Sequence, residues 1–263
     1  PAMPDFARLL TALLLSCLSA LAHGEKLRIV TEPWAPYVYL ENGHAKGIDY
    51  EVTAEVFKRL GVEVEWQFLP WKRCLAMVEQ GLADGVLDIF QTEQRDSQLF
   101  YPSEPLSDVE FVLFYANARP HSINNLEDLR GLTVGTSPGY TYASAFSESP
   151  LFIREPAPTH EANFGKLQRG RIDLLITDRR VGRYMINSMG LKQEISELPL
   201  VISRQSQYLA VRRNVGMDLL VQRFAAELRR FKREPAYAAL HARYAEAGDV
   251  FRTAVEQQEH STP

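Results

Sequence analysis

Cysteines, clusters of basic residues and long apolar stretches are all scarce in this sequence. Only two cysteines, Cys17 and Cys74, stand among its 263 residues, too few for the disulfide framework that stabilises a small secreted domain. Lysine and arginine together number 29 against 33 aspartates and glutamates, which gives a net charge of −4. No run of lysine or arginine suits a polyanion, so we expect no nucleic acid partner.

The composition is otherwise that of an ordinary soluble globular protein. Hydrophobic residues make up 46% of the chain and charged residues 24%, and the sequence has neither an internal repeat nor a low-complexity tract. These values exclude a collagen-like, coiled-coil or intrinsically disordered chain. At roughly 100–200 residues per domain, the length allows two small domains or one large domain.

The first two dozen residues differ from the rest of the chain. Residues 1–2 precede Met3 and are interpreted as a cloning scar. Arg8 then precedes a leucine-rich stretch over residues 9–21, and residues 20–22 (ALA) have the small-x-small pattern of a cleavage site. This order predicts a secretory signal peptide that is cut after the pattern.

Two alternatives to a signal peptide over residues 1–22 stay open. The segment can instead form an apolar N-terminal helix of the fold. Residues 14–17 (LLSC) also resemble a lipoprotein box, although cleavage before Cys17 leaves an apolar stretch of only residues 9–15. If the chain is cut as predicted, Cys74 is its only cysteine, and we expect an exported, periplasmic protein without a disulfide. No other stretch approaches the about 18 apolar residues of a membrane-spanning helix.

Strand-like and helix-like segments alternate after residue 25. Asp49 is placed to cap the first predicted helix, and Cys74 falls on the apolar stripe of the second, as a packed core residue. The alternation predicts an α/β fold of mostly parallel sheets covered by helices, with a ligand crevice beyond the carboxyl ends of the strands. The predicted strands are residues 27–30, 62–68, 132–136, 151–153 and 172–177, and the predicted helices are residues 49–60, 70–80, 160–169 and 179–189.

Two extended segments are interpreted as crossings between two lobes. They are Val109–Tyr115 and residues 206–212. The second crossing is followed by helix-like segments with apolar residues at helical spacing. We therefore expect a two-stranded hinge and the following division of the chain: lobe 1 from residues 25–113 plus 207–247, lobe 2 from residues 114–206, and a polar tail over residues 248–263.

Four segments, in this order and behind a signal peptide, resemble the bacterial extracellular solute-binding proteins of the polar amino-acid type (family 3), which are periplasmic components of ABC importers. The resemblance runs from Glu25 to Gly248. It implies the type II periplasmic binding protein fold, with two lobes, a two-stranded hinge, a monomeric state and neither cofactor nor metal. The segments are residues 31–37 (TEPWAPY), 47–49 (GID), 92–95 (TEQR) followed by 100–105 (FYPSEP), and 173–178 (DLLITD).

The resemblance implies two charged partners for a bound amino acid. A free amino acid carries a carboxylate, which suits a bidentate guanidinium, and an ammonium group, which suits a fixed carboxylate. Arg95 and Asp178 stand at the family's positions for these roles. Read singly, Arg95 can instead be a surface residue paired with Glu93 or Asp96, and Asp178 a simple cap of the following helix.

A turn over residues 137–141 follows a predicted strand and is read as the opening of a helix. In the family, the corresponding turn helps to hold the ligand carboxylate, because backbone N–H groups and a hydroxyl there suit an anion. Thr141 matches the family's threonine, and Gly139 lies in the turn. Gly139 can alternatively be present only to permit a tight turn.

Three aromatic residues fall near the family's side-chain pocket. Trp34 and Tyr37 lie on the loop after the first strand, and Trp71 lies at the start of the second helix. There they can enclose an apolar, aromatic or cationic group, or simply pack in the core of a lobe. The loop over residues 31–37 is one residue shorter than the usual pattern, so which aromatic side chain faces the ligand stays open.

Residues 88–91 (DIFQ) depart from the family, whose members commonly have small residues there. If the register holds, Asp88 and Phe90 point into the cleft. With Glu32 and Asp178, this gives up to three carboxylates against Arg95, a balance that favours a cationic amino acid or a related amine. Asp88 can equally pair with Lys72 or Arg73 and not contact the ligand.

The resulting functional prediction is a binding protein and not an enzyme. Two lobes close on a small polar solute and deliver it to an ABC permease in the inner membrane. A ligand sensor that acts through a membrane receptor is an alternative. An enzyme similar to the cyclohexadienyl dehydratases is less favoured, because the segment after Asp178 lacks a carboxylate and no catalytic motif is present.

Overall fold

The computed structural model describes residues 26–244. The predicted signal peptide over residues 1–22 and the polar tail over residues 248–263 lie outside them. In this part of the chain, nine strands form one mixed sheet in the order β4-β1-β5-β11-β7-β10-β8-β9, with β6 beside β11. The strands are β1 Leu27–Thr31, β4 Val64–Phe68, β5 Gly85–Phe90, β6 Leu99–Phe100, β7 Ser107–Ala116, β8 Thr133–Thr136, β9 Ile153–Pro156, β10 Leu174–Asp178 and β11 Ile195–Arg212.

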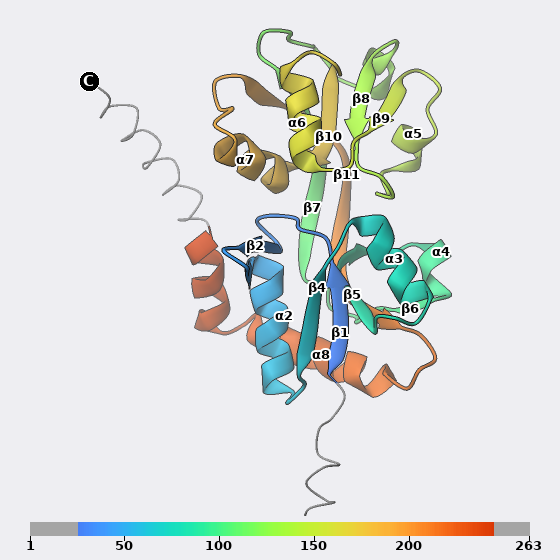
Figure 1. Cartoon of the computed structure of the whole chain (residues 1–263), viewed down its shortest axis with the longest axis vertical. Coiled ribbons are helices and arrows are strands. Elements are labelled where there is room, and N and C mark those ends of the chain that lie inside the picture. Colours follow the sequence, from blue (N-terminus) through green and yellow to red (C-terminus); the bar gives the residue numbers. More distant parts are fainter. Residues whose placement is uncertain (1–25, 245–263) are drawn as a thin grey trace, which may run out of the picture.

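The helices lie against both halves of this sheet (Figure 1). A small hairpin of β2 Tyr39–Glu41 and β3 His44–Lys46 precedes the first of them. No helix of residues 26–244 is both long and apolar enough to cross a membrane. The helices are α2 Ile48–Arg59, α3 Trp71–Glu79, α4 Glu93–Asp96, α5 Ser144–Ser147, α6 His160–Gln168, α7 Arg179–Ser188 and α8 Asp218–Phe231, with a 3-10 turn at Leu126–Leu129. Residues 235–244 are helical as well.

Two long strands run through both halves of the molecule (Figure 1). β7 has 10 residues and β11 has 18, and they pair antiparallel from Ile195 opposite Ala116 to Gln207 opposite Ser107. Around β1 and around β8 the pairing is parallel, as the alternation of strands and helices predicts. The carboxyl ends of β1 and β5 therefore face the turn that follows β8.

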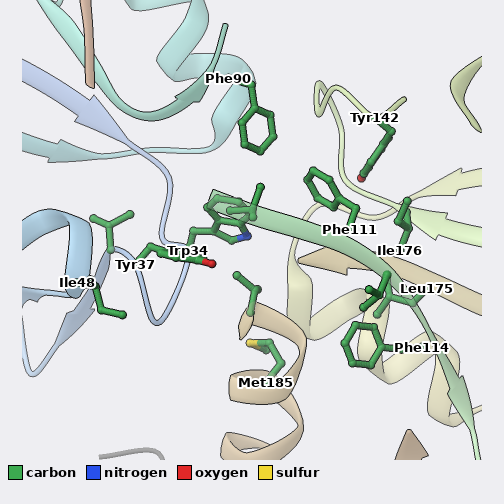
Figure 2. Packing of buried hydrophobic residues seen from close by; sticks show 14 of the residues in the cluster. Trp34, Tyr37, Ile48, Phe90, Phe111, Phe114, Tyr142, Leu175, Ile176 and Met185 are labelled. Atoms are coloured by element: carbon green, nitrogen blue, oxygen red, sulfur yellow. The ribbon is translucent and has the colours of Figure 1, made fainter. Parts of the chain in front are cut away.

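Buried side chains form a large cluster that follows β7 from one half to the other (Figure 2). A second, smaller cluster lies between α3 and β5. Trp71, Cys74 and Val78 form the buried face of α3, so the prediction that Cys74 is a packed core residue is confirmed. The first cluster also contains Trp34, Tyr37 and Phe90. It therefore extends to the loop after β1 and to the end of β5.

The predicted capping role of Asp49 is wrong. α2 begins at Ile48, its N-cap is Gly47, and no side chain caps it. Asp49 instead points into the protein, where its Oδ2 accepts hydrogen bonds from Ser107 Oγ and Gln207 Nε2, both at 2.6 Å. Gly47 has a φ of 124°, and a Cβ there would lie 2.2 Å from the Tyr37 carbonyl oxygen. The helix start is therefore set by close backbone packing.

Three predicted segments differ most from the observed elements. The strand expected at residues 151–153 begins at Ile153, because residues 151–152 form a bend. The extended run at residues 206–212 is only the end of β11, which already begins at Ile195. The turn at residues 137–141 does not open a helix, since α5 starts at Ser144 and has four residues.

Candidate functional site

A pocket lies where the carboxyl ends of β1 and β5 meet the turn after β8. About 370 Å³ of space, including solvent at its mouth, separates the side chains there. α3 and α4 close it from the same half as β1. The lining residues are Thr31, Glu32, Trp34, Trp71, Leu87, Asp88, Phe90, Arg95, Tyr140 and Thr141.

Seven of the ten residues singled out in the sequence line this pocket. Gly139 lies behind its wall, and a Cβ at this position would be 3.3 Å from Trp71. Tyr37 and Asp178 lie outside the pocket. Three lining residues were not singled out: Thr31, Leu87 and Tyr140. An aromatic residue directly after the glycine of the turn was the available signal for Tyr140.

Arg95 enters the pocket from α4. The Thr92 side chain caps this short helix by accepting a hydrogen bond from the Arg95 N–H. Arg95 Nη1 donates to the Phe90 carbonyl oxygen at 3.0 Å, and Cζ lies 5.9 Å from the Trp71 ring centroid. Among residues 26–244 no carboxylate forms an ion pair with Arg95, and Asp96 instead accepts a hydrogen bond from Gln91. Burial lowers the pKa of the guanidinium.

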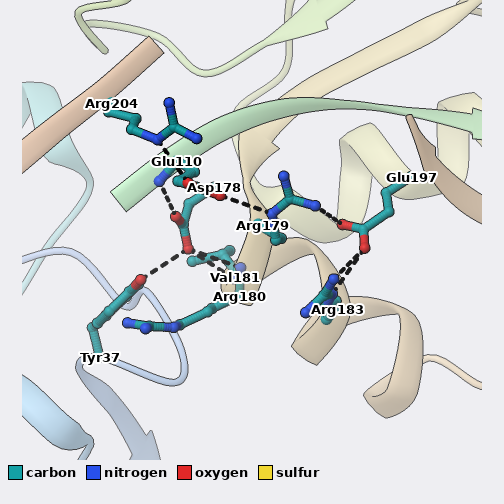
Figure 3. Close-up of polar contacts among 9 residues, drawn as sticks. All are labelled: Tyr37, Glu110, Asp178, Arg179, Arg180, Val181, Arg183, Glu197 and Arg204. Carbon is teal, nitrogen blue, oxygen red and sulfur yellow. Dashed lines mark hydrogen bonds and ion pairs between the residues drawn. The ribbon is translucent and has the colours of Figure 1, made fainter. Parts of the chain in front are cut away.

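The Asp178 carboxylate accepts hydrogen bonds from α7, from β7 and from the Tyr37 side chain (Figure 3). Its Oδ2 accepts the backbone N–H groups of Arg180 at 3.0 Å and Val181 at 3.1 Å, as the N-cap of α7, and also the Tyr37 hydroxyl at 3.1 Å. Its Oδ1 accepts the Glu110 N–H at 3.0 Å. The capping alternative therefore describes Asp178, whose carboxylate accepts four hydrogen bonds within the protein and lies outside the pocket.

Tyr37 belongs to the core rather than to the pocket. Its side chain is fully buried, and its ring lies 5.2 Å from that of Trp34. Trp34 itself is placed between this core and the pocket, with Phe90 at 6.3 Å in an edge-on arrangement. Trp34, and not Tyr37, therefore faces the pocket.

Asp88 forms a carboxyl pair with Asp49. It lies in β5 at a φ of 60°, next to a register shift against β11. Among residues 26–244, neither the backbone nor a non-acidic side chain donates a hydrogen bond to the Asp88 carboxyl group. The group that lies within hydrogen-bonding reach of it is the Asp49 carboxyl group. Two carboxylates share a hydrogen bond only if one of them is protonated.

The surroundings favour the protonated form of Asp88 over that of Asp49. Burial, and then the charge of Asp49, raise the pKa of Asp88 well above its ordinary value. Asp49 carries the negative charge more easily, because Ser107 and Gln207 donate hydrogen bonds to its carboxylate. The predicted set of three carboxylates against Arg95 is not brought together: Asp178 lies outside the pocket, and the pKa of Asp88, which does line it, is raised well above its ordinary value. Neither Lys72 nor Arg73 pairs with Asp88 within the described residues.

Glu32 is the remaining acid of the pocket. Its Oε1 accepts the Trp71 N–H at the start of α3, at 3.3 Å, and its Oε2 accepts the Tyr140 hydroxyl at 2.7 Å. Burial raises the pKa of Glu32, and these two hydrogen bonds oppose the shift. The pocket thus presents the Glu32 carboxyl group and the Arg95 guanidinium between aromatic walls.

Comparisons with known proteins agree with this architecture. The sequence model of the bacterial extracellular solute-binding proteins, family 3, matches residues 27–247. The probable amino-acid-binding protein YxeM of Bacillus subtilis is 24% identical over 213 residues, which cover 76% of this chain and 80% of that protein.

Two solved structures illustrate the shared fold. A histidine kinase sensor domain with similarity to periplasmic binding proteins has a TM-score of 0.74 at 22% identity, over 84% of this chain and 96% of that one. The substrate-binding protein AbpA of Streptococcus pneumoniae, bound to L-arginine, has a TM-score of 0.74 at 19% identity, over 85% and 95%. The predicted α/β fold of a type II periplasmic binding protein is confirmed.

Proposed function

Because the chain belongs to the bacterial extracellular solute-binding proteins of family 3, we propose that it captures a free amino acid, or a related amine, in the pocket between its two halves. The proposal takes the lobes as residues 25–113 plus 207–247 and residues 114–206, with β7 and β11 as the hinge. Closure around the solute then requires contacts from both lobes.

The observation that carries the proposal is the presence of Arg95 and Glu32 in one pocket. A guanidinium that has no ion-pair partner among residues 26–244 suits the carboxylate of an amino acid, and a partly buried carboxylate suits its ammonium group. Trp34, Trp71 and Phe90 supply apolar walls for the side chain. We further propose that Thr141 and the turn at Gly139 support the carboxylate beside Arg95.

The expected preference for a cationic solute loses its main argument. With Asp88 neutral and Asp178 outside the pocket, one negative charge faces one positive charge. Such a pocket matches the zwitterionic backbone of an amino acid and does not require a charged side chain. We therefore propose that the zwitterion is what the pocket recognises, with L-arginine as one candidate among polar amino acids.

Delivery to an ABC permease from the periplasm is part of the same proposal. It is supported by the family, whose members are extracellular binding proteins. Capture without chemical conversion is supported by the curated relative, which is a probable amino-acid-binding protein. A sensor that acts through a membrane receptor would use the same pocket, so binding experiments address the capture step common to both roles.

A thermal-shift screen tests the capture step. The protein is unfolded, dialysed and refolded to remove carried-over solute, and then heated with each of the L-amino acids, common polyamines and small organic acids. A solute at 100 times its Kd stabilises the folded state by about 2.7 kcal/mol, a shift of several degrees. A shift with an amino acid or amine supports the proposal. A refolded protein that none of these compounds stabilises contradicts it.

A further inference from the structure

We propose that Tyr140 competes with the ligand: its hydroxyl holds the two halves together at Glu32, in the place that the ammonium group of a solute takes. This inference rests on the proposed function. It concerns a residue that the sequence did not single out and that lines the pocket beside Arg95.

The contact between Tyr140 and Glu32 bridges the two halves. Tyr140 lies in the turn after β8, and Glu32 follows β1, so the 2.7 Å hydrogen bond between them joins the two halves of the molecule. Burial, and then the charge of Glu32, raise the pKa of Tyr140 well above its ordinary value. The hydroxyl therefore keeps its proton and is the donor in this bond.

Two tryptophans surround the ring of Tyr140. Trp34 and Trp71 present their rings edge-on to that of Tyr140, with centroids 6.1 Å and 6.4 Å away. The phenol thus occupies the aromatic part of the pocket and contacts its acid. A solute that places an apolar group between Trp34 and Trp71 must displace it.

Tyr140 also lies on a route by which a solute can reach the pocket. A wider groove, with about 1140 Å³ of space including open solvent, lies on the other side of Glu32 and is lined by Pro33, Tyr39, His160 and Tyr184 among others. The Tyr140 hydroxyl is 3.3 Å from His160 Nε2. Glu32, Tyr140 and His160 therefore form the wall between the groove and the pocket, and a solute that enters from the groove has to separate them.

The Glu32 carboxylate should bind an ammonium group in preference to the Tyr140 hydroxyl. Burial lowers the pKa of His160 to about 4, so the imidazole is neutral at pH 7 and brings no charge to Glu32, whose hydrogen bond from this wall comes from Tyr140. An ammonium group forms a stronger bond to a carboxylate than a phenol does, because both partners are charged. A solute without a positively charged donor gains no such advantage. The wall would therefore select for an ammonium or guanidinium group.

The test compares the protein with Tyr140→Phe, which keeps the ring and removes the donor. Tyr115→Phe is the matched control, because Tyr115 lies on β7 in the sheet, away from the pocket lining. We measure the radius of gyration of each refolded, solute-free protein by small-angle X-ray scattering. Loss of the contact should enlarge Tyr140→Phe relative to the wild type, while Tyr115→Phe stays unchanged. Equal radii for all three proteins overturn the inference.

Titration calorimetry with each L-amino acid that binds the wild type gives the second readout. Tyr140→Phe should bind about tenfold more tightly, the effect of one hydrogen bond to a charged group, and Tyr115→Phe should bind as the wild type does. Equal or weaker binding by Tyr140→Phe overturns the competition. If no amino acid binds any of the proteins but Tyr140→Phe is enlarged, the proposed function fails while the contact between the halves stands.

Discussion

The hydroxyl of Tyr37 donates a hydrogen bond of 3.1 Å to the carboxylate of Asp178, 141 residues further along the chain. The same carboxylate caps α7 and accepts the Glu110 N–H. One buried side chain thereby connects the loop after β1, the hinge strand β7 and the first turn of α7. A substitution of Asp178 should therefore change the stability of the protein without changing solute binding directly.

Asp178→Ala should destabilise the protein without removing the carboxylate-binding group. Loss of the cap costs about 0.5–2 kcal/mol, and the Tyr37 hydroxyl and Glu110 N–H lose their acceptor, at about 1–3 kcal/mol for each buried group left unsatisfied. Asp178→Asn keeps a capping oxygen and should lose less. Urea unfolding measures both. If Asp178→Asn abolished binding at unchanged stability, Asp178 would have to contact the solute.

Arg95→Gln should weaken binding of a carboxylate solute at least about 30-fold, because truncating a buried charged partner costs roughly 2–5 kcal/mol. Stability should change little, since the only hydrogen-bond acceptor of the guanidinium among the described residues is the Phe90 carbonyl. Arg73→Gln is the control, because Arg73 is exposed on α3. Calorimetry with an amino acid from the screen measures both variants. An unchanged Kd in Arg95→Gln would remove Arg95 from the site.

Asp88→Asn should flatten the pH dependence of stability. The folded pKa of Asp88 is raised above its unfolded value, so the unfolded chain releases this proton first as the pH rises above about 4. Below that pH the protonated Asp88 contributes its whole stabilisation of the folded state. This contribution declines as the pH rises from the unfolded pKa to the folded pKa. An asparagine amide donates to Asp49 without a titrating proton.

Urea unfolding from pH 4 to pH 8 measures the effect. Asp88→Asn should lose less stability than the wild type over this range and be the more stable protein at pH 8. Asp88→Ala supplies no donor and should not show this gain. Identical slopes for wild type and Asp88→Asn would mean that Asp88 is not the protonated member of the pair.

Gly182→Ala should destabilise the fold by about 1–3 kcal/mol through overpacking. A Cβ at this position would lie 2.1 Å from the Phe114 ring, where α7 packs on β7. Gly165→Ala in α6 is the matched control. The nearest atom to its Cβ is the flexible Arg169 guanidinium at 3.1 Å, and alanine favours the helix. Thermal unfolding should separate the two variants, and a Gly182→Ala protein as stable as the wild type would contradict the packing.

Cys74 should be inert towards thiol reagents in the folded protein. Burial raises the pKa of its thiol to about 12, and the side chain is fully buried, so little thiolate is present and none is accessible. In a Cys17→Ser chain, a chromogenic disulfide reagent should react with one thiol only after guanidinium is added. Rapid reaction of the native protein would show that α3 opens readily.

The sequence predicts the elements well where the signal is local. The apolar spacing of α3 places Cys74 in the core, and the alternation of strands and helices gives the α/β fold. The roles of Asp49 and Asp178 are harder to predict. An aspartate at a helix start has the same local pattern whether it caps, binds or is buried, and the partners that decide, Ser107, Gln207 and Tyr37, lie far away in the sequence.

The charge of the pocket is not a local property either. Counting carboxylates near Arg95 assumes that each is ionised and solvated. The structure instead pairs Asp88 with Asp49, which removes one charge, and brings Tyr140 to Glu32. Both relationships depend on contacts between segments more than 35 residues apart. Composition alone therefore overestimates the acidity of the site.

The left-handed backbone at Asp88 also limits how this pocket can diversify. At a φ of 60°, glycine, asparagine and aspartate are accepted readily, while a β-branched residue is strained. A combinatorial library that aims to change the solute should therefore restrict position 88 to these three residues and vary Phe90 and Thr141 more freely. Substitution of Asp88 by valine or isoleucine would first require the bulge in β5 to be straightened.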